Sequence, residues 1–290
     1  MRYLRPAALL AASLVLLLAT DGTGASAEAT AAARAAVPRI RAVTLPDRGA
    51  PPRPHDDWNG PAFDVCTAPP LDTLRAWHGA SPYGAVGIYT SGSQRGCAQP
   101  RLTAEWVRRA RATGWRFLPV HVGAQAPCGD PSRRPARIDP ARAVQQGRDE
   151  AGEATRALQS LGLGPGSPVY LDIEAYPMHD RACGQAVVDF ALGWTQALHS
   201  AGYRSGFYSS LDSGIADLAA AARAGSAPLP DAFWYARWDD HADTAGSGAL
   251  DPGLWSLHQR VHQYRGNVAE TYGGATLTID RNQVDAPTAG

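Results

Sequence analysis

The chain has 290 residues, with 27 basic and 27 acidic side chains, so its formal net charge is zero. This balance argues against a broad nucleic-acid-binding surface and against a polybasic membrane anchor. A hydrophobic content of 44%, with eight Trp, excludes a disordered chain and is ample for a large core.

The N-terminal segment, residues 1–27, is typical of a secretory signal peptide. Arg2 and Arg5 give it a positive start, residues 7–19 form an apolar run, and residues 25–27 (Ala-Ser-Ala) form a small-residue cleavage site. An uncleaved anchor is the alternative, but the apolar run is short for a membrane span. No later segment approaches the length of a span, so we expect a secreted, extracellular protein that can associate with the cell wall.

Residues 28–60 are rich in Ala, Pro and Arg and show no apolar periodicity. This composition predicts an extended linker. The folded domain is expected over residues 61–286.

A regular alternation of apolar runs and amphipathic segments begins after Pro61. The runs predict buried strands at residues 62–66, 85–90, 117–122, 169–174 and 204–209. Helices are expected between and after them, at residues 71–77, 102–113, 139–161, 185–200 and 212–224. Thr103 is the expected N-cap of the second helix, and Asp139 with Pro140 is the expected start of the third. Five strand–helix units in a row require a parallel sheet.

The last part of the domain follows a different pattern. Strand-like segments at residues 232–238, 261–264 and 277–279 are not separated by full helices. Five β/α units followed by three strands predict an α/β fold, a TIM-like barrel of the modified (β/α)5β3 form. A doubly wound open sheet is the alternative, which is weakened because the first strand–helix turn has neither G-x-G-x-x-G nor a P-loop.

Four acids lie at or beside predicted strand ends: Asp64, Asp172, Glu174 and Asp280. In a β/α barrel the chemistry takes place at the carboxyl ends of the strands. Asp172 and Glu174 are two positions apart on one predicted strand, so both side chains should face the same side. Two carboxylates in one cleft push one pKa upward, which suits the acid pair of glycoside cleavage. The alternatives are a solvated D-x-E pair, and structural hydrogen-bond acceptors at Asp64 and Asp280.

Polar and aromatic side chains gather at the same strand ends. Aromatic rings beside carboxylates suit sugars, which have apolar faces and hydroxylated edges. The alternative is that such aromatics, and His121, belong to the core, as we expect for Trp234. The candidate substrate-binding residues are Tyr89, His121, Tyr208, Trp238, Gln263, Tyr264 and Asn282.

Four cysteines make an even set, which in an exported protein predicts two disulfides. They are Cys66, Cys97, Cys128 and Cys183. Spacing alone leaves three connectivities open. A zinc site competes with the disulfides, although the chain has no C-x-x-C pair.

An ordered series of short motifs resembles a known family over about residues 61–285. The series consists of Phe63-Asp64-x-Cys66, Val86-Gly87-Ile88-Tyr89, Gly114-Trp115, Val169-Tyr170-Leu171-Asp172-Ile173-Glu174, Gly193-Trp194, Gly202-Tyr203, Gly206-Phe207-Tyr208-Ser209, Arg260-Val261-His262-Gln263-Tyr264 and Ile279-Asp280. It resembles the glycoside-hydrolase-like domain of the uncharacterised family 1906, found in exported bacterial proteins. That family is similar to the family 25 lysozymes, muramidases with a (β/α)5β3 barrel.

The resemblance implies roles at matching positions. Glu174 would be the general acid, and Asp172 would stabilise the positive transition state or orient the substrate N-acetyl group. Asp64 corresponds to the acid that ends the lysozymes' first strand. Gln263-Tyr264 corresponds to their Q-Y segment, and Asp280-x-Asn282 to their closing D-x-N. After Asp64 the chain lacks the usual Ser and Gln-Gly, so the resemblance supports fold and carboxylate geometry more than muramidase activity.

The carboxylate pair predicts a glycoside hydrolase, and the resemblance implies a cell-wall glycan of the peptidoglycan type as its substrate. We expect a monomer that needs neither cofactor nor metal. The alternatives are a non-catalytic glycan-binding domain on the same barrel, and a metal-dependent hydrolase that uses Asp64, His121 and Asp172. All four cysteines follow successive strands at one barrel end, so neighbouring loops should be joined. We therefore predict the pairs Cys66–Cys97 and Cys128–Cys183.

Overall fold

The computed structural model describes residues 57–132 and 134–290, so the predicted signal peptide and most of the predicted linker lie outside the described residues. The first strand begins at Asp57, which pairs with Pro287 of the last strand. Residues 57–60 therefore belong to the domain and not to the linker, because their backbone is paired in the sheet. Nowhere in the described part of the chain is a helix long and apolar enough to cross a membrane.

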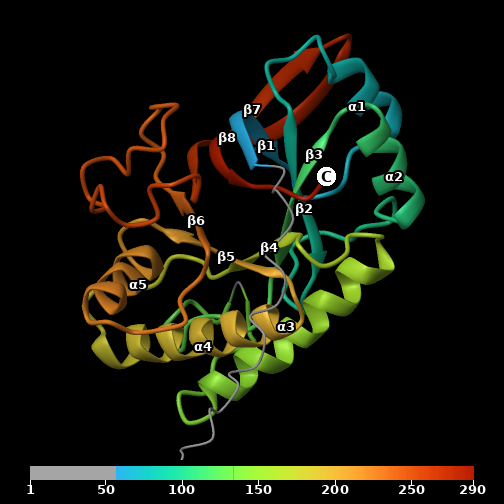
Figure 1. The fold of residues 1–290 in the computed structure, drawn as a ribbon. Coiled ribbons are helices and arrows are strands. Elements are labelled where there is room, and N and C mark those ends of the chain that lie inside the picture. The colour runs from blue at the N-terminus through green and yellow to red at the C-terminus, as the bar shows by residue number, and fades with distance from the viewer. Residues whose placement is uncertain (1–56, 133) are drawn as a thin grey trace, which may run out of the picture. The chain divides into compact units, whose positions relative to one another are not determined.

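In the described part of the chain, eight strands close a barrel in the order in which they follow one another (Figure 1). Neighbouring strands from β1 to β7 run parallel, whereas β8 is antiparallel to both β7 and β1. The strands are β1 (Asp57–Asp64), β2 (Ala85–Ser91), β3 (Arg116–His121), β4 (Pro168–Asp172), β5 (Arg204–Ser210), β6 (Ala232–Ala236), β7 (Arg260–Tyr272) and β8 (Ala275–Pro287).

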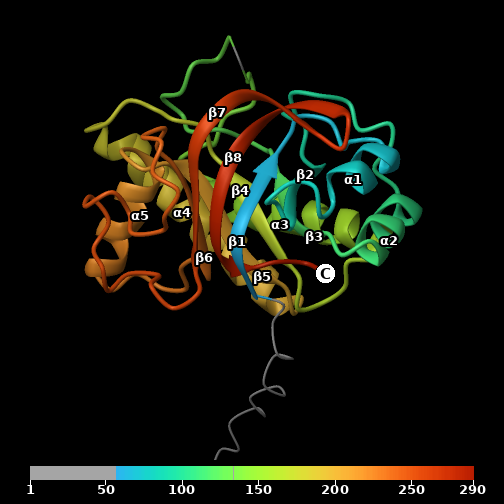
Figure 2. The ribbon, with the colours of Figure 1, turned by 90° about the horizontal axis from the view of Figure 1, so that it is seen from above.

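One helix follows each of the first five strands, and the described chain has none between β6 and β8. The helices are α1 (Leu71–Trp77), α2 (Ala104–Ala112), α3 (Ala143–Ser160), α4 (Arg181–Ser200) and α5 (Gly214–Arg223). The helices cover one side of the barrel, and β7, β8 and β1 form a side without a helical layer (Figure 2). The predicted (β/α)5β3 barrel is confirmed, and the open sheet is wrong because β1 and β8 are hydrogen-bonded.

Local sequence signals explain the boundaries of α2, but the predicted starts of the third and fourth helices are wrong. Thr103 caps α2 by accepting a backbone N–H at 3.1 Å, and Gly114 follows the helix with a φ of +101°, which favours glycine. The third helix starts at Ala143 and not at the predicted Asp139. The reason is that Asp139 accepts the N–H of Ala141 in a turn that precedes the helix. The fourth helix begins at Arg181 and not at residue 185, because Asp180 caps it by accepting the backbone N–H of Cys183.

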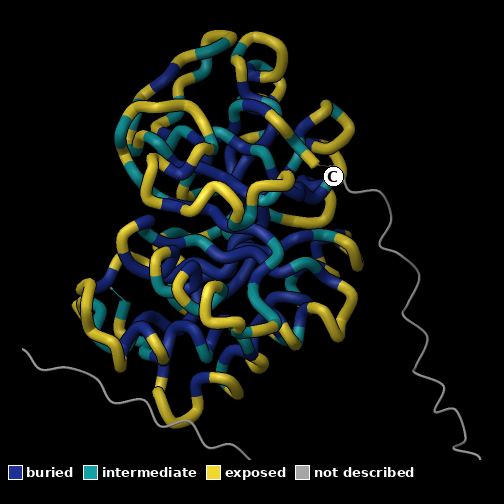
Figure 3. Tube along the Cα trace, turned by 60° about the vertical axis from the view of Figure 1, so that its left-hand side comes forward, coloured by how far each residue is buried: buried dark blue, intermediate teal, exposed yellow. Residues whose placement is uncertain are grey.

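Two apolar layers lie on the two faces of the barrel sheet. The outer layer packs between strands and helices, and Figure 3 shows the buried segments at the centre of the domain. The inner layer fills the lumen and includes Ala62, Leu118, Val120, Tyr170, Trp234, Val261 and Val284. Because strand side chains alternate between the two faces, these positions define which later residues also face the lumen. Asp64 follows Ala62 by two positions, and Asp172 follows Tyr170 by two.

The last two strands are each 13 residues long, much longer than the predicted segments 261–264 and 277–279. β1 pairs with β8 only from Asp280 onward, so the earlier part of β8 and the later part of β7 form a free hairpin that turns at Gly273 and Gly274. The indole of Trp77 on α1 anchors this hairpin by donating to the carbonyl of Ala275 at 2.9 Å. The predicted lengths were wrong because most hairpin residues are exposed or half-buried and give no clear apolar alternation.

Candidate active site

Asp64 lies at the carboxyl end of β1, inside the lumen, with 2% of its surface exposed. Its Oδ1 accepts hydrogen bonds from the side-chain amides of Gln263 at 3.1 Å and Asn282 at 2.8 Å. Its Oδ2 accepts the phenolic O–H of Tyr89 at 2.9 Å. We call Asp64, Tyr89, Gln263 and Asn282 the floor network, because these side chains close the lumen end of the cleft.

Two opposing effects act on the pKa of Asp64. Burial, and then the nearby charge of Asp280, raise the pKa of Asp64 to about 7. The hydrogen bonds from Asn282, Gln263 and Tyr89 act in the opposite direction. Asp64 therefore exchanges its proton near neutral pH.

Asp172 ends β4 and is also buried, with 3% of its surface exposed. In contrast to Asp64, its Oδ1 accepts no hydrogen bond from any residue that the structure describes. Burial, followed by the charge of Glu174, raises the pKa of Asp172 well above its ordinary value, and Arg134 opposes this rise. A buried carboxyl oxygen without a donor costs folding free energy, and such costs concentrate at functional sites.

Glu174 lies two residues beyond the end of β4, so the prediction that both acids share the strand is wrong. The side chain of Gln125 takes the place of further strand pairing. Its Nε2 donates to the carbonyl of Asp172 and its Oε1 accepts the backbone N–H of Glu174, both at 2.8 Å. The carboxylate of Glu174 is 49% exposed. The pair therefore consists of a buried acid and an exposed one.

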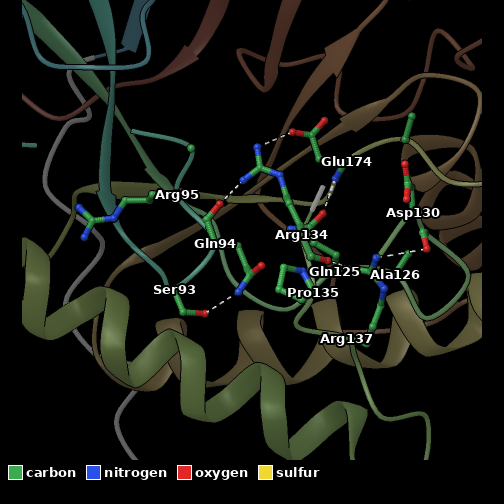
Figure 4. Close-up of a pocket in the computed structure, with 13 residues that line it drawn as sticks. Ser93, Gln94, Arg95, Gln125, Ala126, Asp130, Arg134, Pro135, Arg137 and Glu174 are labelled. Carbon is green, nitrogen blue, oxygen red and sulfur yellow. Dashed lines mark hydrogen bonds and ion pairs between the residues drawn. The ribbon is translucent and has the colours of Figure 1, made fainter. Parts of the chain in front are cut away.

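Arg134 binds the exposed acid. Its Nη2 lies 2.7 Å from Oε1 of Glu174, and its Nη1 donates to the carbonyl of Gln94 (Figure 4). Arg134 belongs to the long loop between β3 and α3, whereas Gln94 follows β2. The guanidinium thus connects three neighbouring loops across the mouth of the barrel.

Asp280 lies opposite Asp64 in the β1–β8 register. Burial and the charge of Glu174 raise the pKa of Asp280, and a 2.7 Å hydrogen bond from the backbone N–H of Asn267 opposes them. Tyr208 shows how the four predicted acids are arranged. Burial first, and then the charges of all four, raise the pKa of this phenol, so the structure brings them together around it.

Two adjoining pockets open at this end of the barrel and share Glu174 and Ala175. The first has a volume of about 690 Å³ and is lined by the loops after β2 and β3 (Figure 4). The second has a volume of about 350 Å³ and includes Tyr208, Trp238 and Gln263 in its lining. Glu174 therefore lies where the two pockets meet.

Trp238 presents a fixed aromatic surface to the second pocket. Trp238 is 58% exposed, and its indole N–H donates to Oε1 of Gln263 at 3.1 Å. The same oxygen accepts the phenolic O–H of Tyr208 at 3.1 Å. Behind the ring is Gly266, where a Cβ would lie 2.1 Å from the indole. Because the ring is already held in place, it can stack on a sugar without a further loss of side-chain conformational entropy.

His121 does not reach the cleft, contrary to its selection as a substrate-binding candidate. It has no exposed surface, its Nδ1 lies 2.8 Å from Oγ of Ser91, and its Nε2 lies 3.0 Å from the carboxylate of Glu150. It follows the lumen-facing Val120 and therefore faces α3. The metal-dependent alternative with Asp64 and Asp172 fails for the same reason, because His121 is on the other face of the sheet.

Tyr264 also lies outside the cleft. It follows Gln263 on β7, and strand alternation turns it to the opposite face. Burial raises the pKa of Tyr264, and the charges that act on it are those of Arg281, Glu270 and Asp240, none of which lines either pocket. Tyr89 and Asn282 stay at the site, but they contact Asp64 and do not line the pockets.

Both predicted disulfides are confirmed. Cys66 is bonded to Cys97, which joins the loops after β1 and β2, and Cys128 is bonded to Cys183, which joins the β3–α3 loop to α4. Cys128 and Cys183 also lie close to Asp180, but bonded sulfurs offer no thiolate to a metal. The zinc alternative for the cysteines is therefore wrong.

Gln125 and Arg134 were not predicted as site residues from the sequence. Both lie in the irregular segment between β3 and α3, where no periodicity points to a contact. The available signal was the group of arginines between Cys128 and α3, in a loop expected at the carboxyl end of a strand. Gln125 had no comparable signal, because its role is to hold the backbone of another segment.

A closed β/α barrel with acids gathered at the carboxyl ends of its strands is an arrangement that glycoside hydrolases use. The family model described as "Rv2525c-like, glycoside hydrolase-like domain" matches residues 75–284, and the chain belongs to this family. The resemblance inferred from the motif series is thereby confirmed. No curated protein matches the chain.

Solved structures match the chain at low sequence identity. The crystal structure of an uncharacterized B. stearothermophilus protein is 17% identical with a TM-score of 0.51, over 77% of this chain and 95% of that one. A muramidase from Acremonium alcalophilum is 18% identical with a TM-score of 0.45, over 77% and 92% of the two chains. The catalytic domain of the endolysin ply40 from bacteriophage P40 of Listeria monocytogenes is 16% identical with a TM-score of 0.42, over 78% and 93%. The first of these supports the fold.

Proposed function

We propose that this protein is a secreted glycoside hydrolase that cleaves a cell-wall glycan of the peptidoglycan type. The observation that carries the proposal is the position of Glu174, an exposed carboxylate where two pockets meet, beside the buried Asp172. Membership of a glycoside hydrolase-like family supports it. Two disulfides are compatible with an extracellular location.

In this mechanism the glycan lies across both pockets, and its scissile bond passes Glu174. Protonated Glu174 gives its proton to the glycosidic oxygen, the C1–O bond breaks, and the leaving sugar departs as an alcohol. Asp172 must first lose the proton that burial favours, a loss that the charge of Arg134 assists, and its carboxylate then stabilises the positive charge that develops on the remaining sugar. Water then adds to C1, directly or after internal attack by an acetamido oxygen, and its proton returns to Glu174.

The remaining site residues support this pair. Tyr208 and Trp238 face the second pocket, and Gln263 accepts a hydrogen bond from each of them. Gln263 also donates to Asp64, so the floor network positions the aromatic surface on which a sugar would stack. Asp64 and Asp280 add negative potential at the same end of the lumen.

The ion pair between Arg134 and Glu174 favours a second candidate function, non-catalytic glycan binding. A carboxylate that is held by a guanidinium has no proton to donate, so turnover requires this ion pair to open. A domain in which it never opens would bind glycan through the same pockets without cleaving it.

The test compares reducing ends released from purified wall glycan by the wild type and by Glu174→Gln. We expect Glu174→Gln to lose about 10²- to 10⁴-fold of the activity, the usual contribution of a general acid. Glu105→Gln, at an exposed acid on α2, is the matched control and should retain full activity. Equal release by wild type and Glu174→Gln contradicts the proposal. Glycan binding without release by either protein favours the non-catalytic function.

A further inference from the structure

We propose that the first pocket binds a sugar unit that carries a negatively charged group, either a carboxylate or a phosphate. The inference rests on the proposed glycan binding and adds the chemical class of one bound unit. Three arginines line this pocket, Arg95, Arg134 and Arg137, against two acids, Asp130 and Glu174. The pocket therefore has a formal excess of positive charge in a protein whose overall charge is zero.

Two of the three guanidinium groups keep their charge uncompensated. Arg95 donates to the carbonyls of Tyr89 at 3.4 Å and Gly92 at 3.3 Å. Arg137 donates to backbone carbonyls as well, at 3.2 Å to each of Gly129 and Ala136. Among the described residues, neither arginine has a carboxylate at ion-pair distance. Carbonyl oxygens orient a guanidinium but do not neutralise it.

The acids of the pocket offset only part of this charge, because two carboxylates stand against three guanidinium groups. Oδ1 of Asp130 accepts the backbone N–H of Ser132 at 2.9 Å and its hydroxyl at 2.7 Å. Glu174 is engaged by Arg134. Figure 4 shows Arg134 in the middle of the pocket, Arg137 towards one end, and Arg95 at the other end with its guanidinium directed away from Arg134.

The lining suits a charged sugar better than a free ion. Guanidinium groups bind carboxylate and phosphate through paired N–H donors. Ser93 and Gln94 add hydroxyl and amide groups that match sugar hydroxyls, and about 690 Å³ is far more than one small anion needs.

Arg134 connects this pocket to the proposed chemistry. An anionic group on the bound sugar would compete with Glu174 for the guanidinium of Arg134. Binding of the charged unit would then release the Glu174 carboxylate beside the glycosidic bond. A neutral sugar lacks this effect, so the pocket would select for charged glycans before cleavage begins.

The first experiment measures binding to the full chain by NMR titration with three matched sugars. The probes are N-acetylglucosamine, N-acetylmuramic acid with its carboxylate, and N-acetylglucosamine 6-phosphate. At least one charged sugar should bind about tenfold more tightly than the neutral one. Raising NaCl from about 0.05 M to about 0.5 M should weaken the charged sugar alone, because salt screens the attraction.

The second experiment tests the arginines. Arg137→Gln and Arg95→Gln should each reduce the preference for the charged sugar severalfold, whereas Arg109→Gln on the outer helix α2 should not. Arg137 also holds its loop, so Arg95→Gln at an exposed side chain and the salt dependence of the wild type decide the matter if Arg137→Gln does not fold.

The outcomes separate this inference from the proposed function. A preference for the carboxylate sugar or for the phosphate sugar supports the inference and identifies which group is bound. Equal binding of all three sugars, or a preference that survives both substitutions, overturns the inference and leaves glycan binding intact. No binding of any sugar overturns both proposals.

Discussion

The floor of the cleft and its rim hold their carboxylates in different ways. On the floor, Asp64 is buried and receives three hydrogen bonds from side chains on three other strands. On the rim, Glu174 is 49% exposed, lies beyond the end of its strand, and is held by one ion pair from a loop. The floor is therefore fixed by the fold, whereas the rim can rearrange around a ligand.

This difference indicates where stability and function should separate. Residues of the floor network support one another, so a change there should affect folding. Residues of the rim contact water and the pockets, so a change there should affect binding or turnover more than folding. The following predictions test this division, from the largest expected effect to the smallest.

Removing the floor acid should have the largest effect on folding. Asp64→Ala leaves the donors of Tyr89, Gln263 and Asn282 without their acceptor, and we expect a loss of about 3–5 kcal/mol in the free energy of unfolding. Urea denaturation measures this loss. The matched control is Asp212→Ala at a rim acid that is 53% exposed and pairs with Arg237, where less than about 1 kcal/mol is expected. Similar losses in both variants contradict the division.

Removing the disulfides should destabilise the rim loops. Cys128–Cys183 spans 55 residues and Cys66–Cys97 spans 31, so loss of either should cost about 2–4 kcal/mol, with the longer loop at the upper end. The double variant Cys128→Ser/Cys183→Ser should also weaken glycan binding, because this bond anchors the loop that carries Arg134. Thermal unfolding with and without reductant, together with a binding titration, checks both effects. An unchanged midpoint on reduction would show that the bonds are dispensable.

The sequence allowed the floor to be predicted and the rim only in part. Asp64 and Asp172 were identifiable because each ends an apolar strand, and a barrel brings strand ends together. Gln263 was identifiable because it follows the apolar start of β7 at the same end of the barrel. Gln125 and Arg134 were missed because a loop conformation depends on tertiary contacts that leave no periodic signal. His121 was misplaced for a related reason. Its position near a strand end does not show whether its side chain faces the lumen or the helices. A shift of one residue along a strand moves the side chain from one face of the sheet to the other.

The buried acids should make stability fall as pH rises. Burial is the main cause of the raised pKa of Asp64, Asp172 and Asp280. A folded protein that keeps protons which the unfolded chain loses becomes less stable with rising pH, here from about pH 4 to about pH 7. The fall should reach about 1.4 kcal/mol per pH unit for each group that remains protonated.

Other groups do not reverse this trend. The hydrogen bond with Asp231 raises the pKa of His199, so its stabilisation is also lost as pH rises through that value. Hydrogen bonds with Ser247 and the backbone of His241 lower the pKa of Asp239, although some burial opposes them. The contribution of Asp239 to stability therefore changes only below about pH 4. Urea denaturation at several pH values from 4 to 7 gives the slope. A stability that rises over this interval contradicts the assigned protonation of the floor.

The smallest change in stability is expected at Asp172, although it lies as deep as Asp64. Its Oδ1 accepts no hydrogen bond within the described structure, so Asp172→Asn takes the acceptor from no existing donor to that atom and removes the cost of ionising a buried group. The free energy of unfolding at neutral pH should stay the same or rise by about 1 kcal/mol, and the pH slope should become shallower. Hydrolysis should nevertheless fall about 10²-fold, because a neutral amide cannot stabilise positive charge on the sugar. If Asp172→Asn keeps its stability but loses turnover, Asp172 acts like the functional residues of the rim although it is buried like the floor acid Asp64. A large destabilisation with normal turnover would instead make it a structural acid like Asp64.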